Sequence, residues 1–157
     1  MRKQKGFSLI ELLIVVAIIL IIAAIAIPNL LRSRIAANEA SAVGSVRTLN
    51  TAEVTYASTY PQQGFTCTLS NLGPTTANPT STLAGLIDGV LASGVKSGYN
   101  FSLSNCSGSP EVLYNSLAVP VATGSTGQRG FCSDQSGVIH FNAAGTGCAP
   151  GTDPALQ

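Results

Sequence analysis

The stretch that decides the fold is residues 5–28, KGFSLIELLIVVAIILIIAAIAIP, close to the N-terminus. Its residues 12–27 carry no charge and no hydrogen-bonding side chain. Counted from Phe7, the apolar run is long enough to cross roughly 30 Å of hydrocarbon as a helix. Arg2, Lys3 and Lys5 precede it, and positive residues at this position keep their end of a helix in the cytoplasm. The stretch therefore predicts a membrane-spanning helix, with the rest of the chain translocated.

An ordinary secretory signal peptide would explain part of this pattern. It would supply the basic start, the apolar core and a small-x-small cleavage site at Ala24-Ile25-Ala26. However, the apolar run is longer than the usual core of a signal peptide, and the following residues remain compatible with a helix as far as Pro61. A signal peptide also gives no reason for Glu11, the one acid in the stretch. We therefore interpret the apolar helix as part of the mature protein.

The amino-acid composition argues against a nucleic-acid-binding protein and against a zinc protein. The chain has 157 residues, a net charge of +1 and only 10% charged residues, which argues against a basic surface for nucleic acid. Its four cysteines show no C-x-x-C spacing and it has one histidine, His140, so a zinc site is not expected. An even number of cysteines after a membrane-targeting segment favours two disulfides outside the cytoplasm.

Five features of the first residues occur together. A short basic leader ends at Gly6, Phe7 follows it, Glu11 lies four residues further on, and the apolar run continues without interruption to Pro28. This segment resembles the N-terminus of type IV pilins and pseudopilins, over roughly the first third of the chain. The resemblance implies that residues 1–6 are a leader peptide and that a prepilin peptidase cuts between Gly6 and Phe7. The new Phe7 amine would then be N-methylated, and residues 7–28 would remain as the transmembrane and assembly helix.

The resemblance also assigns Glu11 a role in assembly. Cleavage would leave a positive amino group on Phe7, and an ionised Glu11 in hydrocarbon is costly unless it is paired. Between helices stacked with an axial stagger, Glu11 of one subunit can meet the Phe7 amine of its neighbour, which would penalise a wrong register. The alternative is a lone acid that reaches the lipid headgroups from the end of its helix.

Pro28 is the other residue of this segment that we single out for assembly. Its ring removes the backbone donor that would bond the carbonyl of Ala24. We expect a kink, or a locally melted stretch of the kind common around this proline in assembled pilins.

The remaining chain predicts an α+β fold: a long N-terminal helix, transmembrane and then amphipathic, that packs on a C-terminal antiparallel sheet of about four strands. Residues 29–60 form the amphipathic half, and residues 61–157 form the globular head. One stripe of the amphipathic half is apolar, and strand signals follow in residues 98–104, 112–122, 128–134 and 137–143. The pilin family has the same layout. The residues of the stripe are Ile35, Ala42, Val46, Leu49, Tyr56 and Tyr60.

The four cysteines allow three connectivities. We favour Cys132–Cys148, because this bridge would tie the tail to the third predicted strand and close a short loop. Cys67–Cys106 would then join the loop after the helix to the turn after the first strand. A cysteine-bounded C-terminal region is frequent in pilins, so the first bridge also fits the resemblance.

Catalytic chemistry is not indicated. His140 lies in a strand pattern with no recognisable serine or cysteine constellation, and Asp134 and Asp153 lack the D-x-D-x-D spacing of a calcium loop. We expect no enzymatic activity, no cofactor and no metal.

The leading interpretation is a structural subunit of an extracellular type IV pilus. Its partners would be identical subunits, the prepilin peptidase, the pilus assembly machinery of the inner membrane and, before assembly, the membrane itself. A pseudopilin of a type II secretion system, forming a periplasmic pseudopilus, is the alternative and would have the same N-terminus. A secreted, disulfide-linked binding module that discards the apolar segment is a third class.

Overall fold

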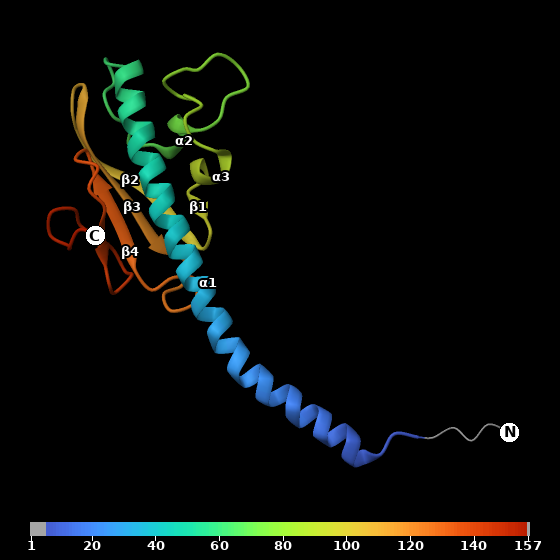
Figure 1. Ribbon diagram of the computed structural model, residues 1–157. Coiled ribbons are helices and arrows are strands. Elements are labelled where there is room, and N and C mark those ends of the chain that lie inside the picture. The colour runs from blue at the N-terminus through green and yellow to red at the C-terminus, as the bar shows by residue number, and fades with distance from the viewer. Residues whose placement is uncertain (1–5, 157) are drawn as a thin grey trace. The chain divides into compact units, whose positions relative to one another are not determined.

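The computed structural model describes residues 6–156 (Figure 1). The basic residues expected to form the leader, Arg2, Lys3 and Lys5, lie outside this range. The chain divides into two compact units, Met1–Arg34 and Ile35–Gln157. Each unit is described by itself below, and the second is called the head.

Helix α1 spans Leu9–Thr59 and contributes residues to both units. Within the first unit its large apolar side chains are exposed. It is the one helix of the described residues that is long and apolar enough to cross a membrane. The helix ends one residue before the predicted boundary at Tyr60-Pro61, where a proline cannot continue the hydrogen-bond ladder.

The head contains one five-stranded antiparallel sheet with the strand order β1-β2-β3-β4-β5. This arrangement of a long helix and an antiparallel sheet confirms the predicted α+β class. The additional strand, β1, is only two residues long, which is too short to produce an alternating pattern in the sequence. The strands are β1 Val95–Lys96, β2 Tyr99–Gly108, β3 Glu111–Pro120, β4 Gly130–Asp134 and β5 His140–Asn142.

Alternation in the longest strands places their apolar residues on the core face. Tyr99, Phe101 and Leu103 of β2 are buried and the residues between them are exposed. A proline within a strand sequence usually indicates an edge strand or a bulge, but β3, which contains Pro120, lies between β2 and β4. Pro120 is the last residue of β3, and β4 pairs with β3 only as far as Ala118, so the missing amide hydrogen removes no bond to β4.

The core of the head lies between α1 and the sheet (Figure 1). The predicted stripe supplies the helix side of this core: four of its residues are buried, and Tyr60 is half-buried at its margin. Tyr114 and Phe131 supply large fully buried rings from the sheet. The four buried stripe residues are Ala42, Val46, Leu49 and Tyr56.

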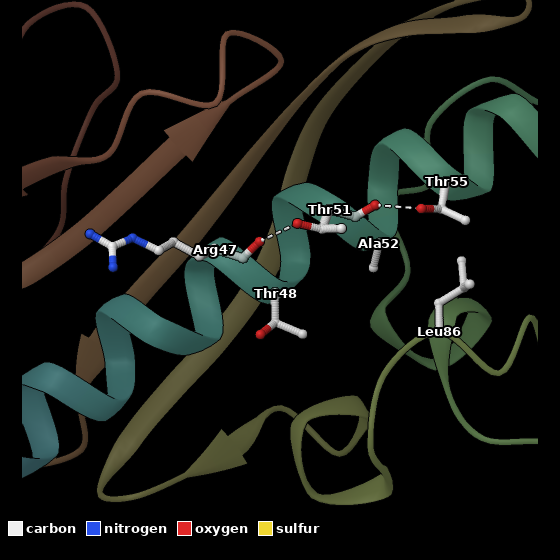
Figure 2. A pocket seen from close by; sticks show the side chains of 6 residues that line it. All are labelled: Arg47, Thr48, Thr51, Ala52, Thr55 and Leu86. Atoms are coloured by element: carbon white, nitrogen blue, oxygen red, sulfur yellow. Dashed lines mark hydrogen bonds between the residues drawn. The ribbon is translucent and has the colours of Figure 1, made fainter.

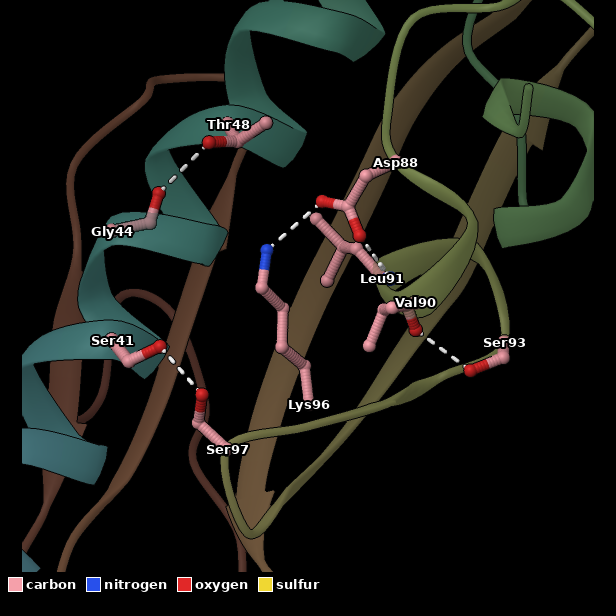
Figure 3. Close-up of polar contacts among 9 residues, drawn as sticks. All are labelled: Ser41, Gly44, Thr48, Asp88, Val90, Leu91, Ser93, Lys96 and Ser97. Carbon is pink, nitrogen blue, oxygen red and sulfur yellow. Dashed lines mark hydrogen bonds and ion pairs between the residues drawn. The ribbon is translucent and has the colours of Figure 1, made fainter.

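Residues 60–98 connect α1 to β2 and contain, besides β1, two short helices, α2 Leu69–Leu72 and α3 Gly89–Ala92. Asp88 caps α3 by accepting a hydrogen bond from the Leu91 amide, at 2.9 Å, and its other oxygen pairs with Lys96 Nζ (Figure 3). Ser41 of α1 donates to Ser97 at 2.9 Å. These bonds attach the connection to both α1 and the start of the sheet.

Two disulfides close loops in the head. Cys67, in the connection after α1, is bonded to Cys106 of β2. Cys132 of β4 is bonded to Cys148 in the C-terminal segment. These are the two pairs that the sequence analysis favoured among the three possible connectivities.

Candidate functional site

The junction between Gly6 and Phe7 directly precedes helix α1. Both residues are exposed, and Phe7 keeps 81% of its surface accessible. A Cβ built on Gly6 would have no heavy atom within 4 Å. Nothing in the described chain therefore obstructs this bond.

Glu11 lies in the first turn of α1 and caps the N-terminus of the helix. Its Oε2 accepts a hydrogen bond from the Ser8 amide at 2.8 Å, and the Leu12 amide donates to the Ser8 carbonyl at 3.2 Å. Ser8 and Glu11 thus occupy the first and fourth positions of a capping box. The sequence analysis missed this second role, although the S-x-x-E spacing of residues 8–11 signals it. Among the described residues, no cation forms an ion pair with Glu11.

The helix behind this junction presents an apolar surface on every side. Phe7, just before the helix, and Leu9, its first residue, are the most exposed of the large apolar residues, and a shallow hollow runs along one face of the first turns of α1. None of the apolar side chains up to Leu31 is buried within the chain. The hollow is lined by Leu9, Leu12, Leu13, Val16, Ala17 and Leu20.

Pro28 lies inside α1, and the backbone is helical on both sides of it. Of the two expectations for Pro28, a kink or a locally melted stretch, the melted stretch is therefore not present in this structure. The proline still leaves the carbonyl one turn earlier without its usual amide donor.

Comparison with known proteins bears on this same segment. A family model described as a prokaryotic N-terminal methylation motif matches residues 1–27. The type IV wide pilus major component PilA4 of Thermus thermophilus is 67% identical over 39 residues, which cover 25% of this chain and 30% of that protein. The type IV major pilin protein PilA of Myxococcus xanthus is 45% identical over 54 residues, which cover 34% of this chain and 24% of that protein.

The N-terminal third of this chain is similar to that of type IV major pilins. The aligned part spans less than a third of the length of either relative. No solved structure matches this chain. The similarity to pilins is thus limited to about the first third of the chain.

The head of this pilin-like chain contains a carboxylate, Glu39, that the sequence analysis did not single out. Its Oε1 accepts hydrogen bonds from the Gln128 and Arg129 amides, at 3.0 and 3.1 Å, and its Oε2 pairs with the Arg129 guanidinium. Burial raises the pKa of Glu39, but the bonds from Arg129 and the two amides outweigh it, and the pKa is lowered overall. Through these bonds Glu39 links α1 to Gln128 and Arg129, the two residues before β4. Glu39 precedes Ala42 of the stripe by three residues, and this helical spacing could have indicated that its side chain faces the core.

A second buried acid, Glu53, behaves differently. It is fully buried, its Oε2 accepts a hydrogen bond from the Thr66 amide at 2.9 Å, and its Oε1 has no hydrogen-bond partner among residues 6–156. Glu53 lies four residues after Leu49 on the stripe, so its burial follows from helical spacing.

Residues 47–55 of α1 line an open hollow of about 320 Å³ (Figure 2). Its threonine hydroxyls donate to α1's own carbonyls: Thr51 to Arg47 at 3.1 Å and Thr55 to Thr51 at 2.8 Å. The side chains drawn in Figure 2 present a cation at one end and a leucine from the connection at the other. The lining residues are Arg47, Thr48, Thr51, Ala52, Thr55 and Leu86.

Asp134, Asp153 and His140 have local roles in the head. Asp134 accepts from the Ser136 amide in the turn after β4. Asp153 accepts from Asn142 and the Ala149 amide, and its backbone carbonyl lies 2.6 Å from His140 Nδ1. Within residues 6–156, no group of three histidine, cysteine or acidic side chains is arranged to hold a metal ion.

Proposed function

We propose that this chain is a structural subunit of an extracellular type IV pilus, assembled into a helical filament through the apolar half of α1. The observation that supports this most is the start of that helix. A glycine–phenylalanine junction stands free in front of it, Glu11 lies in its first turn, and the apolar residues that follow are all unburied.

The physical reason for a filament is the apolar surface itself. Such a helix is stable in lipid and costly in water, because burial of apolar area contributes about 25 cal/mol per Å². A bundle of like helices replaces lipid with protein, so the subunit leaves the membrane without exposing the helix. A head-to-tail contact that does not close then extends into a fibre.

Processing would precede assembly. We propose that a prepilin peptidase cuts between Gly6 and Phe7 and that the Phe7 amine is N-methylated, consistent with the methylation motif that matches residues 1–27. The precursor would stay in the inner membrane until the pilus assembly machinery takes it up. Glu11 would then pair with the Phe7 amine of an adjacent subunit and set the register, and Pro28 would adjust the helix in the fibre.

The alternative is a pseudopilin of a type II secretion system in a periplasmic pseudopilus. Both curated relatives are named as major components of type IV pili, which favours the pilus.

Electron microscopy of cells with and without this chain tests the proposal. Surface filaments should disappear with the gene and return with the wild-type chain, and sheared filaments should contain a chain whose intact mass begins at Phe7. Unchanged filaments that lack this chain would contradict the proposal. A chain confined to the periplasm, whose loss blocks protein secretion, would instead establish the pseudopilin alternative.

A further inference from the structure

The Glu53 carboxyl group lies in the core of the head, where it is poorly satisfied. The side chain is 0% exposed. Its Oε2 accepts one hydrogen bond, from the Thr66 amide, and its Oε1 accepts none from the described residues. A buried carboxylate with a single amide donor is much less stable than one in water.

The groups around Glu53 offer no compensating positive charge. The ion pairs of the described residues are Lys96–Asp88 and Arg129–Glu39, and neither includes it. Tyr56, on α1, and Tyr114, on β3, are near enough for Glu53 to raise their pKa values, after the larger effect of their burial. The Tyr114 hydroxyl donates to Asn50 at 3.1 Å and so gives Glu53 no bond. Asp134, on β4, also raises the pKa of Tyr114. It is an acid and therefore supplies no positive charge either.

Burial therefore favours the neutral form. It raises the pKa of Glu53 to about 7, although the hydrogen bond from Thr66 acts in the opposite direction. An acid with this pKa changes its charge near neutral pH, whereas an ordinary glutamate is already ionised there.

The donor to Glu53 belongs to a segment that is otherwise held by the sheet. Phe65 donates from its amide to the Glu111 carbonyl at 3.0 Å, and Cys67 is bonded to Cys106 of β2. For residues 65–67, the Thr66 amide bond to Glu53 is the one described hydrogen bond that reaches α1. The protonation state of Glu53 thus acts at the junction between the helix and this segment.

We propose that Glu53 is a proton-dependent latch, whose neutral carboxyl group keeps residues 65–67 fastened to α1 and whose ionisation releases them. When the segment is released, water can hydrate the Glu53 carboxylate. In the closed arrangement the side chain is fully buried and has no contact with solvent. The latch is a property of the head and holds whether or not the chain forms a pilus.

The direction of the pH effect is opposite to that of most acids. The pKa of Glu53 is raised from 4.5, so the closed state keeps a proton that the open state releases. The contribution of Glu53 to closure is therefore present at acidic pH and is lost as the pH rises toward and through about 7. If the open carboxyl group regains its ordinary pKa, the open population increases on the order of 50-fold between pH 5 and pH 8.

Amide hydrogen exchange on the full chain in detergent micelles tests the latch. The protection factor of the Thr66 amide corrects for the intrinsic pH dependence of exchange, and in the wild type it should fall by on the order of 50-fold from pH 5 to pH 8. Glu53→Gln keeps an oxygen acceptor and cannot ionise, so its protection should not depend on pH. Glu111→Gln is the matched control, because Glu111 Oε2 is also buried and has no hydrogen-bond partner in the part of the chain that the structure describes. It should retain the wild-type pH dependence.

The carboxyl ¹³C shift of Glu53 in the wild-type chain is the second measurement, and it does not require the variant to fold. A midpoint near pH 7, together with the loss of the pH dependence in Glu53→Gln, would support the latch. A midpoint near the ordinary 4.5, or the same pH dependence in Glu53→Gln as in the wild type, would overturn it. Constant protection of Thr66 in the wild type would overturn it as well.

Discussion

At the scale of single residues, Glu11 combines two roles that its sequence position alone does not separate. Its carboxylate accepts from the Ser8 amide and so caps the helix, which needs only a hydrogen-bond acceptor. Pairing with the amine of an adjacent Phe7 needs a negative charge. Glutamine retains the first property and removes the second, whereas alanine removes both.

We expect Glu11→Ala and Glu11→Gln to be processed and inserted into the membrane, because each makes the segment less charged. Both should fail to enter filaments if the buried Phe7 amine requires a counter-charge. The measurement is the amount of each chain in sheared filaments relative to the membrane fraction. A Glu11→Gln chain that assembles at the wild-type level, beside an inactive Glu11→Ala chain, would show that capping and not charge is required.

Gly6 offers a clean test of the processing site. No atom lies within 4 Å of a Cβ at this position, so a bulky residue would not disturb the described chain. We expect Gly6→Val to accumulate as an uncut precursor, visible by intact mass. Gly44→Ala is the matched control, since Gly44 also has open space around it and lies within α1. It should be cut normally, with α1 stabilised by about 0.5–1 kcal/mol.

Glu39 should stabilise the head in a pH-dependent way. Its pKa is lowered from 4.5, so its contribution is full above that value and is lost as the pH falls through the lowered pKa. Because the Arg129 side chain is 39% exposed, solvent weakens the pair, and Glu39→Gln should cost about 1–2 kcal/mol at pH 7. Denaturant unfolding at pH 7 and pH 3 measures this cost.

The cost of Glu39→Gln should shrink at pH 3. Asp88→Asn, which keeps the cap of α3 but removes an exposed ion pair, should cost less than about 1 kcal/mol. An equal cost of Glu39→Gln at both pH values would show that the charge of Glu39 is not the stabilising feature.

At the scale of elements, the periodic spacing of apolar residues correctly predicted the long helix and the longer strands. Alternation in residues 99–103 indicated β2, and the apolar stripe indicated the buried face of α1. Strand β1 was missed because Val95 and Lys96 are held by pairing with β2 and not by a pattern of their own. Glu39 and Glu53 were not singled out because the sequence analysis assigned only Ile35, Ala42, Val46, Leu49, Tyr56 and Tyr60 to the stripe, whereas position relative to these residues decided the burial of both acids. A kink or a locally melted stretch was expected at Pro28, and the helix continues through this residue without a melted stretch.

The two disulfides should differ in their contribution to stability. Cys67 and Cys106 are 39 residues apart, and Cys132 and Cys148 are 16 apart. Since a longer closed loop restricts the unfolded chain more, removal of the first pair by alanine substitution should cost about 4 kcal/mol and removal of the second about 3 kcal/mol. Denaturant unfolding of the two double variants measures both costs. The reverse order, or a peptide map that joins Cys67 to Cys132, would contradict this assignment.

At the scale of the whole molecule, the head has a core that involves none of the residues of the apolar segment. Every residue of that core lies in the unit Ile35–Gln157. A chain that starts at Asn29 should therefore fold and remain monomeric without detergent, and it should not form filaments. Sedimentation velocity and near-ultraviolet circular dichroism check this.

Tyr56→Ala in the same shortened chain is the control, because this ring is 2% exposed in the core. It should lose about 3–5 kcal/mol of stability. A shortened wild-type chain that is disordered or aggregated would show that the head depends on the apolar segment.

The hydroxyl groups on the outer face of α1 have a mechanical consequence. Five of them donate to carbonyls one turn earlier, carbonyls that the helical ladder also uses, and they all lie on one face of the helix. Shared acceptors of this kind weaken the ladder locally and often bend a helix. We therefore expect α1 to bend more easily along the head than a helix of alanine and leucine would. The face that carries the hydroxyl groups determines the direction in which it bends most easily. Those side chains are Thr48, Thr51, Thr55, Ser58 and Thr59.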